Sequence, residues 1–301
     1  MSKPMIEVAN LTCDYGHGRG VFDLSFTVYQ GEVFGFLGPN GAGKTTTIRQ
    51  LMGFVRPDRG SAKILGLDCF AQSAKIQSNV GYLPGELALM EDMSGEGFLN
   101  LIAGMKGLRD PSRMEQLCNL FELNPHQRIR RMSKGTKQKL GLVCAFMGSP
   151  EILILDEPTS GLDPLMQNRF TQLLLKEKER GATILLSSHL FEETEKTCDR
   201  VAILRAGRLA AVEQMQKLRD SRTRSYTFVF PDEQLAQKAL AQWGGKGQLE
   251  ANSLSVTLDN AAGLPELLGI AAECKACDLR EKSQTLEELF LHFYGEVQQD
   301  A

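Results

Sequence analysis

A glycine-rich stretch near the N-terminus has the residue types and spacing of a phosphate-binding loop. The sequence GPNGAGKTTT occupies positions 38–47 and fits the pattern G-x-x-x-x-G-K-T. Glycines let such a loop turn tightly and direct backbone N–H groups at phosphate oxygens. We therefore expect a nucleoside triphosphate to contact Gly38, Pro39, Asn40, Gly41, Ala42, Gly43, Lys44, Thr45 and Thr46.

The segments on either side of the loop support this interpretation. An apolar run at 33–37 precedes it, and residues 44–52 have the pattern of a helix whose N-terminus adds partial positive charge near the phosphates. Lys44 is expected to reach the β- and γ-phosphates, and Thr45 to bind Mg²⁺ through its hydroxyl. The alternative is a chance glycine-rich turn, which this strand–loop–helix context disfavours.

Two adjacent carboxylates end the apolar run EILILDEP at 151–158. In an open α/β sheet, ligands bind at the carboxyl ends of the strands. Asp156 is expected to hold Mg²⁺ through a water, and Glu157 to polarise the water that attacks the γ-phosphorus. Because adjacent strand residues point to opposite faces, the two carboxylates would take different tasks. The alternative is an acidic strand end that begins a turn at Pro158.

A histidine follows the next apolar strand, ATILLSS at 182–188. His189 therefore lies where the other strands deliver their phosphate-binding groups. A neutral imidazole there can donate one N–H to the γ-phosphate. The alternative is a structural histidine with satisfied hydrogen bonds.

The run MSKGTKQK at 132–139 predicts a second anion site at the start of a helix. Ser133 can cap that helix, Gly135 permits close backbone approach, and Lys134 and Lys137 add positive charge. Since one nucleotide does not need two such sites, we expect Ser133 and Gly135 to face a nucleotide held by a second copy of the chain.

The elements that position these residues follow from the hydrophobic pattern. Alternating apolar residues at 6–13 and 23–30 predict half-buried antiparallel strands. From about 84 to 150 the spacing becomes helical, and after Pro150 buried strands alternate with helices. The pattern predicts an α/β fold with an antiparallel arm, a mostly parallel core sheet and a helical subdomain at about 84–150.

The pattern changes near Ser221, so we expect an ATPase domain at 1–220 and an accessory domain at 221–301. The order β-α-β-β-α-β in the second part predicts a small α+β, ferredoxin-like unit. Its elements include a strand at 274–282 and a closing helix at 285–295. If CKAC at 274–277 is a strand, its two thiols lie on opposite faces, which favours reduced cysteines over a metal or redox site.

Composition limits the function classes. The chain has 301 residues, of which 42% are apolar and 24% charged, with a net charge of -3, so we expect no nucleic-acid partner. No apolar run reaches the roughly 20 residues that cross a bilayer, and the N-terminus lacks the apolar core of a secretion signal. Seven scattered cysteines argue against a disulfide framework. We expect a cytoplasmic chain whose membrane role, if any, comes through a partner.

As a set, GPNGAGKTT, YLPGE, SKGTKQ, ILILDEPTSGLD and SSH resemble the motifs of an ATP-binding cassette (ABC) ATPase over about residues 5–215. In that family, two cassettes bind two ATP molecules head to tail. The resemblance implies that Tyr15 stacks on adenine and that residues 160–163, including Asp163, cross the dimer interface. It also implies that the ATP held by a second copy, or by a homologous cassette, is contacted by Ser133, Lys134, Gly135 and Thr136.

The chain departs from the family pattern at two places. The signature usually reads L-S-G-G-Q, whereas this chain has Met132, Ser133, Lys134, Gly135 and Thr136. The loop after YLP usually carries a glutamine, but here Gly85 takes that place and Glu86 follows. We expect both residues near the nucleotide, with either Glu86 or a water in place of the missing amide at Mg²⁺.

The resemblance is greatest to cassettes that pair with a separate six-helix ABC-2 type permease. It implies an ATPase on the cytoplasmic face of the membrane that powers export of a drug, antibiotic, lipid or polysaccharide. ATP would close the dimer, and the permease would dock near residues 80–93. The alternatives are an importer cassette or a soluble ATPase that acts on ribosomes or DNA. The single P-loop and the lack of a long coiled coil disfavour the soluble class.

Overall fold

The alternating segments near the N-terminus form a four-stranded antiparallel sheet with the order β2-β1-β4-β5. Its strands are β1 (Pro4–Asp14), β2 (Gly20–Tyr29), β4 (Arg59–Ile64) and β5 (Leu67–Asp68). This computed structural model describes residues 3–221, 223–258, 263–284 and 288. The predicted helix at 285–295 lies, apart from Glu288, outside the described residues.

The apolar runs of the core form a six-stranded sheet with the order β10-β9-β3-β8-β7-β6. All neighbouring pairs are parallel except β9 with β10. Every residue of β3, β7 and β8 is buried, as expected for strands covered on both faces. The strands are β3 (Val33–Leu37), β6 (Val80–Leu83), β7 (Ile152–Asp156), β8 (Thr183–Ser188), β9 (Arg200–Arg205) and β10 (Arg208–Gln214).

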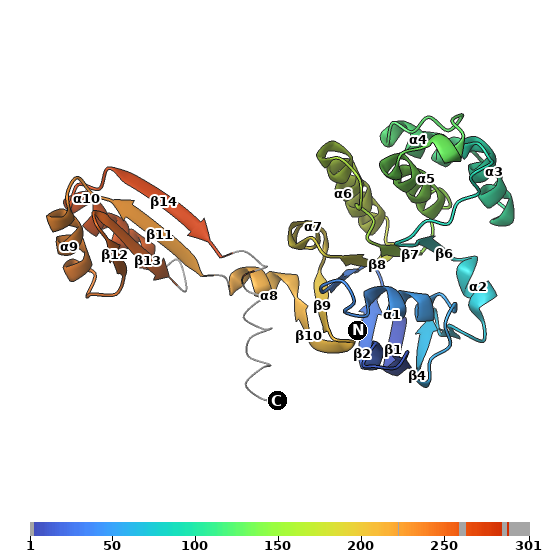
Figure 1. The fold of residues 1–301 in the computed structure, drawn as a ribbon, viewed down its shortest axis with the longest axis horizontal. Helices are drawn as coiled ribbons and strands as arrows, with labels where there is room; N and C mark the ends of the chain where they lie inside the picture. The colour runs from blue at the N-terminus through green and yellow to red at the C-terminus, as the bar shows by residue number, and fades with distance from the viewer. Residues whose placement is uncertain (1–2, 222, 259–262, 285–287, 289–301) are drawn as a thin grey trace. The chain divides into compact units, whose positions relative to one another are not determined.

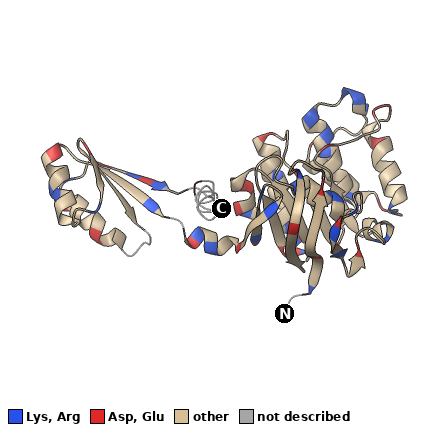
Figure 2. Cartoon of the chain, turned by 60° about the horizontal axis from the view of Figure 1, so that its bottom comes forward, with Lys and Arg blue, Asp and Glu red and all other residues tan. Residues whose placement is uncertain are grey.

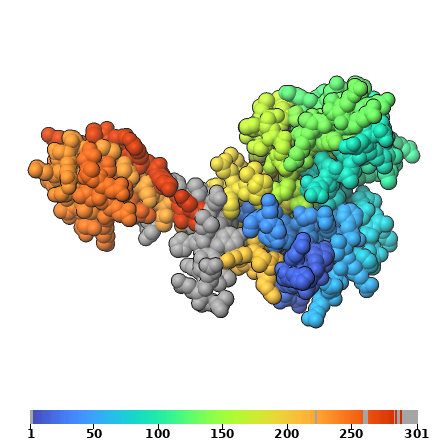
Figure 3. Space-filling model, in the orientation of Figure 1, coloured from blue at the N-terminus to red at the C-terminus, as the bar shows by residue number. Residues whose placement is uncertain are grey.

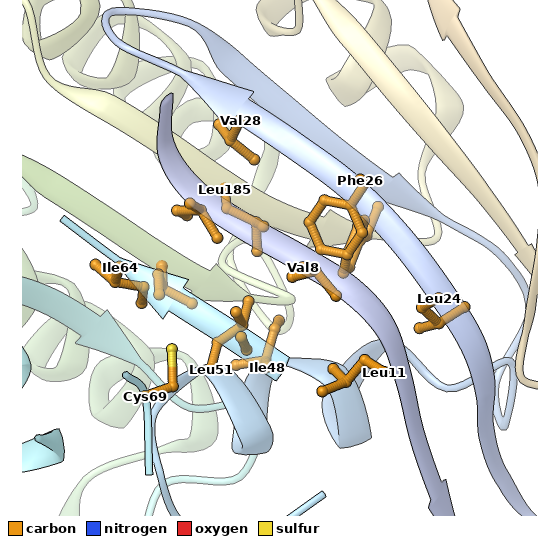
Figure 4. Close-up of a cluster of buried hydrophobic side chains, with 14 of the residues drawn as sticks. Val8, Leu11, Leu24, Phe26, Val28, Ile48, Leu51, Ile64, Cys69 and Leu185 are labelled. Atoms are coloured by element: carbon orange, nitrogen blue, oxygen red, sulfur yellow. The ribbon is translucent and has the colours of Figure 1, made fainter. Parts of the chain in front are cut away.

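Helix α1 (Lys44–Leu51) links the two sheets, because it contacts β2, β4 and β7. Its residues Ile48 and Leu51 are fully buried in a core that includes Val8, Phe26 and Leu185 (Figure 4). The N-terminus of α1 is therefore held firmly at the carboxyl end of β3. A short helix, α2 (Ser73–Gln77), follows β5.

Three helices form the predicted helical subdomain: α3 (Gly95–Met105), α4 (Ser112–Leu120) and α5 (Lys134–Phe146). A 3₁₀ turn, Ile129–Arg131, precedes α5. Helix α5 contacts α3, α4 and β6, so it joins the subdomain to the core sheet. Figures 1 and 3 show the three helices gathered into one lobe.

Two further helices belong to the first part of the chain, α6 (Pro164–Glu179) and α7 (Phe191–Thr197), and a third, α8 (Met215–Asp220), follows at the boundary between the two parts. The chain divides into two compact units, Met1–Met215 and Gln216–Ala301. No helix in the described part of the chain combines the length and apolar character needed to cross a bilayer.

The second unit has the predicted order of elements and its own buried core. Its antiparallel sheet has the order β12-β13-β11-β14, which is the ferredoxin-like arrangement. The elements are β11 (Arg224–Val229), α9 (Glu233–Gln242), β12 (Gln248–Glu250), β13 (Ser253–Leu258), α10 (Leu264–Glu273) and β14 (Asp278–Ser283).

The prediction of a strand over CKAC is wrong. Cys274 is the C-cap of α10, and β14 begins only at Asp278, because the chain must turn between the helix and the strand. Cys274 is buried and Cys277 is exposed. The described residues contain no group of three or more side chains suited to hold a metal ion.

Candidate functional site

The glycine-rich loop connects the buried strand β3 to α1. Gly43, the residue before the helix, has a φ of 108°. A Cβ atom added to Gly38 would lie 2.5 Å from the Leu204 carbonyl oxygen, and one added to Gly43 would lie 2.6 Å from the Val21 side chain. Both positions therefore require glycine. Residues 39–41 form the exposed tip of the loop, whereas Ala42 and Lys44 are buried.

Lys44 is 6% exposed and connects the loop to a carboxylate. Its Nζ donates a hydrogen bond to the Gly38 carbonyl oxygen at 2.6 Å and lies 3.3 Å from Glu157 Oε1. These are the oxygen partners that a phosphate group can replace. Thr45 and Thr46 follow in the first turn of α1 and are half-buried.

Asp156 ends β7 and is fully buried. Its Oδ1 accepts a hydrogen bond from Ser187 Oγ at 2.5 Å, whereas Oδ2 has no hydrogen-bond partner among the described residues. A Cβ atom on Gly85 would lie only 3.0 Å from that Oδ2. An unpartnered buried carboxylate oxygen is a suitable ligand for Mg²⁺, so the donor set fits the expected metal. Glu86 follows Gly85 in an exposed loop.

The explanation given above for the two carboxylates is wrong in one respect. Glu157 lies beyond the end of β7 and has a left-handed backbone with a φ of 51°. This backbone conformation, rather than the alternation of side chains along a strand, makes the Glu157 side chain point in a different direction from that of Asp156. It is unfavourable for a non-glycine residue. Two hydrogen bonds hold it, from Glu157 N to Ser187 O at 3.2 Å and to Ser187 Oγ at 3.1 Å.

His189 lies against Glu157, a contact that its place after β8 did not by itself predict. Its Nδ1 is 2.5 Å from Glu157 Oε2, and the histidine side chain is 54% exposed. Glu157 thus contacts Lys44 through one oxygen and His189 through the other. The ends of β3, β7 and β8 bring these three side chains together from positions far apart in the sequence.

Two residues of this region escaped the sequence analysis. Gln138, buried in α5, donates from Nε2 to the carbonyl oxygens of Glu157 at 3.2 Å and Pro158 at 2.9 Å. A lone polar side chain on an otherwise apolar helix face is a signal that would have identified it. Glu193 is the other: it is buried in α7, and burial raises its pKa to about 7.

Residues 133–136 form a separate group at the start of α5. Ser133 caps the helix, because its Oγ accepts a hydrogen bond from Thr136 N at 3.1 Å. A Cβ atom on Gly135 would lie 2.5 Å from the Gly161 carbonyl oxygen, and Lys134 lies over Gly161. No hydrogen bond or ion pair joins residues 133–136 to residues 38–46, all of which are described.

Asp163 and Tyr15 lie outside both groups. Asp163 is exposed and caps α6, where its Oδ1 accepts a hydrogen bond from Met166 N at 3.0 Å. Tyr15 is 54% exposed and follows β1. Desolvation and Cys13 raise the pKa of its hydroxyl, whereas Thr46 and Arg49 lower it. The ring is therefore close to α1 and open to a ligand.

The surface charge has no single sign. Figure 2 shows Lys and Arg interspersed with Asp and Glu over the elements of both units. The basic residues of the run 130–139 include Lys137, which pairs with Glu91 at 2.7 Å.

Comparisons with known proteins agree with this geometry. A family model described as ABC transporter matches residues 21–160. The chain is 32% identical over 301 residues, 99% of its own length and 98% of the relative's, to the uncharacterized ABC transporter ATP-binding protein YhcH of Bacillus subtilis. It is 32% identical to the bacitracin transport ATP-binding protein BcrA of Bacillus licheniformis over 241 residues, a stretch that covers 79% of each protein.

A solved structure has the same fold as the first unit. It is a dimeric post-hydrolysis state of the ATP-binding cassette MJ0796 bound to ADP and Pi. The TM-score is 0.63 at 20% identity, over 70% of this chain and 99% of that one. At this identity the likeness establishes the fold.

Proposed function

The chain belongs to the ABC transporter family as an ATP-binding and ATP-hydrolysing subunit, and from that premise we propose that it powers a membrane exporter. Two copies would hold ATP between them, and their closure would change the access of a separate permease. The observation that carries the ATPase role is the contact of Glu157 with both Lys44 and His189 at the end of the phosphate-binding loop.

ATP binding would rearrange the contacts of Lys44. Its ammonium group now interacts with the Gly38 carbonyl oxygen and with Glu157. Phosphate oxygens would take over these interactions, supported by the backbone N–H groups of residues 40–46 and the N-terminus of α1. Glu157 would then be released from the lysine and keep its contact with His189.

Glu157 would act as the general base. Its Oε2 is held by His189 Nδ1, which leaves the other imidazole nitrogen to reach the γ-phosphate. Asp156 and Thr45 would hold Mg²⁺, which supplies charge neutralisation at the β- and γ-phosphates when bound. The orphan Asp156 Oδ2 supports this assignment.

The second anion site supports a composite pocket. Ser133 and Lys134 are exposed and make no polar contact with the phosphate-binding loop of their own chain. A helix N-terminus attracts anions. We place these residues, with Gly135 and Thr136, on the ATP of a second copy. The dimeric ADP- and Pi-bound relative supports this arrangement.

A groove between core and helical subdomain suits a permease segment. It has a volume of about 320 Å³ and is lined by Phe54, Tyr82, Leu87, Phe98 and Ile102, among others. Phe54 is 55% exposed and contacts the Tyr82 ring. An apolar segment of a membrane protein would cover these side chains and hold the chain on the cytoplasmic membrane face.

Export rather than import is the proposed direction, and the relative named for bacitracin transport supports an antibiotic as a class of cargo. An antibiotic, drug, lipid or polysaccharide remains the proposed class of cargo. Both relatives are named as transport proteins or their subunits, which supports transport over action on ribosomes or DNA.

The test is co-purification with a multi-span membrane protein, wherever a neighbouring reading frame encodes one. We expect the wild-type chain to co-purify and to show ATPase activity that the membrane protein increases. Phe54→Asp should abolish the association but keep the basal ATPase activity. Met105→Asp, at a 77% exposed residue outside the groove, is the control and should change neither. Full association of Phe54→Asp would contradict the docking site.

A further inference from the structure

A carboxyl group lies buried beneath the loops that carry Glu157 and His189. Glu193 belongs to the first turn of α7, directly after the His189 loop, and is 8% exposed. It does not contact Lys44, Glu157 or His189 through a hydrogen bond. The hydrolysis mechanism proposed above therefore leaves it without a role.

One oxygen of this carboxyl group joins the two loops. Glu193 Oε2 accepts hydrogen bonds from Ser188 Oγ at 2.6 Å and from Thr159 Oγ1 at 3.1 Å. Ser188 immediately precedes His189, and Thr159 follows Glu157 by two residues. Ser188 Oγ also accepts a hydrogen bond from Leu190 N at 3.0 Å. The residues before and after His189 are therefore both held through Ser188.

These bonds close a ring of contacts around the proposed base. On one side, His189 Nδ1 lies 2.5 Å from Glu157 Oε2. On the other, the chain runs from Glu157 to Thr159, across to Glu193, and back through Ser188 to His189. If the Glu193 bonds were lost, the His189–Glu157 contact would remain, together with the bonds of Ser187 to Asp156 and to the Glu157 N–H, but neither Thr159 nor Ser188 would be held by Glu193.

The surroundings make an ionised carboxyl group costly at this place. The pKa of Glu193 is raised to about 7, mainly by burial and to a lesser extent by nearby Glu157, against the lowering effects of Ser188, Thr159 and His189. The thiol of Cys198 is the other ionisable group that interacts with it. Glu193 Oε1 is buried with no hydrogen-bond partner among the described residues. A neutral side chain would avoid this desolvation, so packing alone does not explain an acid here.

We propose that Glu193 is a positioning residue for ATP hydrolysis, whose carboxylate fixes the His189 loop against the turn that follows Glu157. The inference rests on the proposed role of Glu157 as the base. Glu193 does not touch the nucleotide in this account. It acts by keeping His189 and Glu157 at hydrogen-bond distance when ATP takes Lys44 away from Glu157.

The experiment compares three variants of the full chain in a steady-state ATPase assay. Glu193→Ala removes the acceptor, and we expect kcat to fall about 10- to 100-fold, with little change in KM, because small misplacements of a catalytic group cost rates of that order. Glu193→Gln keeps a neutral acceptor oxygen and should recover most of the activity near neutral pH. Glu192→Gln is the matched control on the same helix, 91% exposed, and should behave as wild type.

The dependence on pH separates positioning from a merely structural role. Glutamine resembles the protonated acid, so the ratio of kcat for Glu193→Gln to that of wild type should be close to one at about pH 6. It should fall severalfold by about pH 8, where wild-type Glu193 is ionised. Glu157 and His189 are present in both proteins, so their own titration largely cancels in the ratio.

Stability gives an independent readout. A raised carboxyl pKa contributes stability that is complete below the ordinary glutamate pKa and is lost as the pH rises through about 7. The Tm of wild type should therefore fall relative to that of Glu193→Gln over this range. If Glu193→Ala does not fold, its melting curve will show this. The pH dependence of the kcat ratio of Glu193→Gln to wild type then tests the positioning role alone.

Two outcomes are distinguishable. A ratio that stays constant between about pH 6 and pH 8 would overturn the positioning role but leave the ATPase function intact. A wild-type chain that binds ATP without hydrolysing it would overturn the proposed function, and this inference with it.

Discussion

Glu157 connects the phosphate-binding loop to the His189 loop, and its left-handed backbone makes this possible. Glu157 Oε1 lies 3.3 Å from Lys44 Nζ, so the proposed base and the proposed phosphate-binding cation are paired with each other. A triphosphate carries more negative charge than one carboxylate and would compete for the lysine. At the scale of single residues, we therefore expect ATP binding to release Glu157 from Lys44.

Replacement of Lys44 by alanine tests the phosphate-binding loop. Lys44→Ala removes the ammonium group that lies 3.3 Å from Glu157 Oε1 and that would bind the phosphates. We expect ATP affinity or turnover to fall about 10²- to 10³-fold, as for the loss of one preorganised charge partner. Nucleotide titration and an ATPase assay measure the effect. Lys196→Ala, at an exposed lysine of α7, is the control, and wild-type hydrolysis in Lys44→Ala would refute the assignment.

The proposed base has its own test. Glu157→Gln keeps the size of the side chain and a contact with His189 but removes the proton acceptor. We expect ATP to bind with near wild-type affinity while kcat falls about 10²- to 10⁴-fold, the usual contribution of a general base. Binding and single-turnover hydrolysis are measured separately. Substantial turnover in this variant would show that another group accepts the proton.

At the scale of elements, α5 connects the two anion sites of one chain. Its first turn presents Ser133 and packs Gly135 against Gly161, and its second turn holds the backbone after Glu157 through Gln138. The helix also contacts β6, α3 and α4. A shift of the helical subdomain would therefore displace the backbone at Glu157.

Close packing of α5 against residue 161 predicts a specific loss of stability. In Gly135→Ala the new Cβ atom would lie 2.5 Å from the Gly161 carbonyl oxygen, so backbone must move. We expect a loss of about 1–3 kcal/mol in the free energy of unfolding, typical of overpacking. Gly104→Ala in α3 has no atom within 4 Å of its Cβ and should instead gain roughly 0.5–1 kcal/mol. Urea denaturation measures both, and equal stabilities would contradict the close approach.

At the scale of the whole molecule, the chain consists of two units with separate buried cores. All residues of the proposed ATP site belong to the first unit. That unit presents a phosphate-binding loop and, apart from it, the N-terminus of α5. This arrangement is expected of a chain that completes its ATP site with a second copy.

The composite pocket predicts dimerisation that depends on ATP. Glu157→Gln with saturating ATP and Mg²⁺ should elute as a dimer in size-exclusion chromatography, and as a monomer without nucleotide. Adding Ser133→Asp should prevent the dimer but preserve ATP binding by the monomer. Aspartate caps helices about as well as serine, so α5 should persist while a negative charge opposes the partner's γ-phosphate. A monomer for Glu157→Gln under saturating ATP would count against the composite pocket.

The sequence alone determined the features that depend on neighbouring residues. The phosphate-binding loop at 38–46, the buried runs that became β3, β7 and β8, and the Ser133 cap each follow from a short local pattern. The carboxyl ends of parallel strands meet at one edge, so it was also predictable that the residues after β7 and β8 would lie near Lys44.

Tertiary structure decided the features that join distant segments. The strand assigned to CKAC failed because a helix end and a turn look apolar over so short a stretch. The direction of Glu157 was explained wrongly because its left-handed backbone is held by Ser187, thirty residues away. Gln138 donates hydrogen bonds to carbonyl groups 19 and 20 residues away, and Glu193 accepts a hydrogen bond from Thr159, which lies 34 residues away in the sequence. No local spacing encodes such contacts, because they form only when the sheet brings the ends of its strands together.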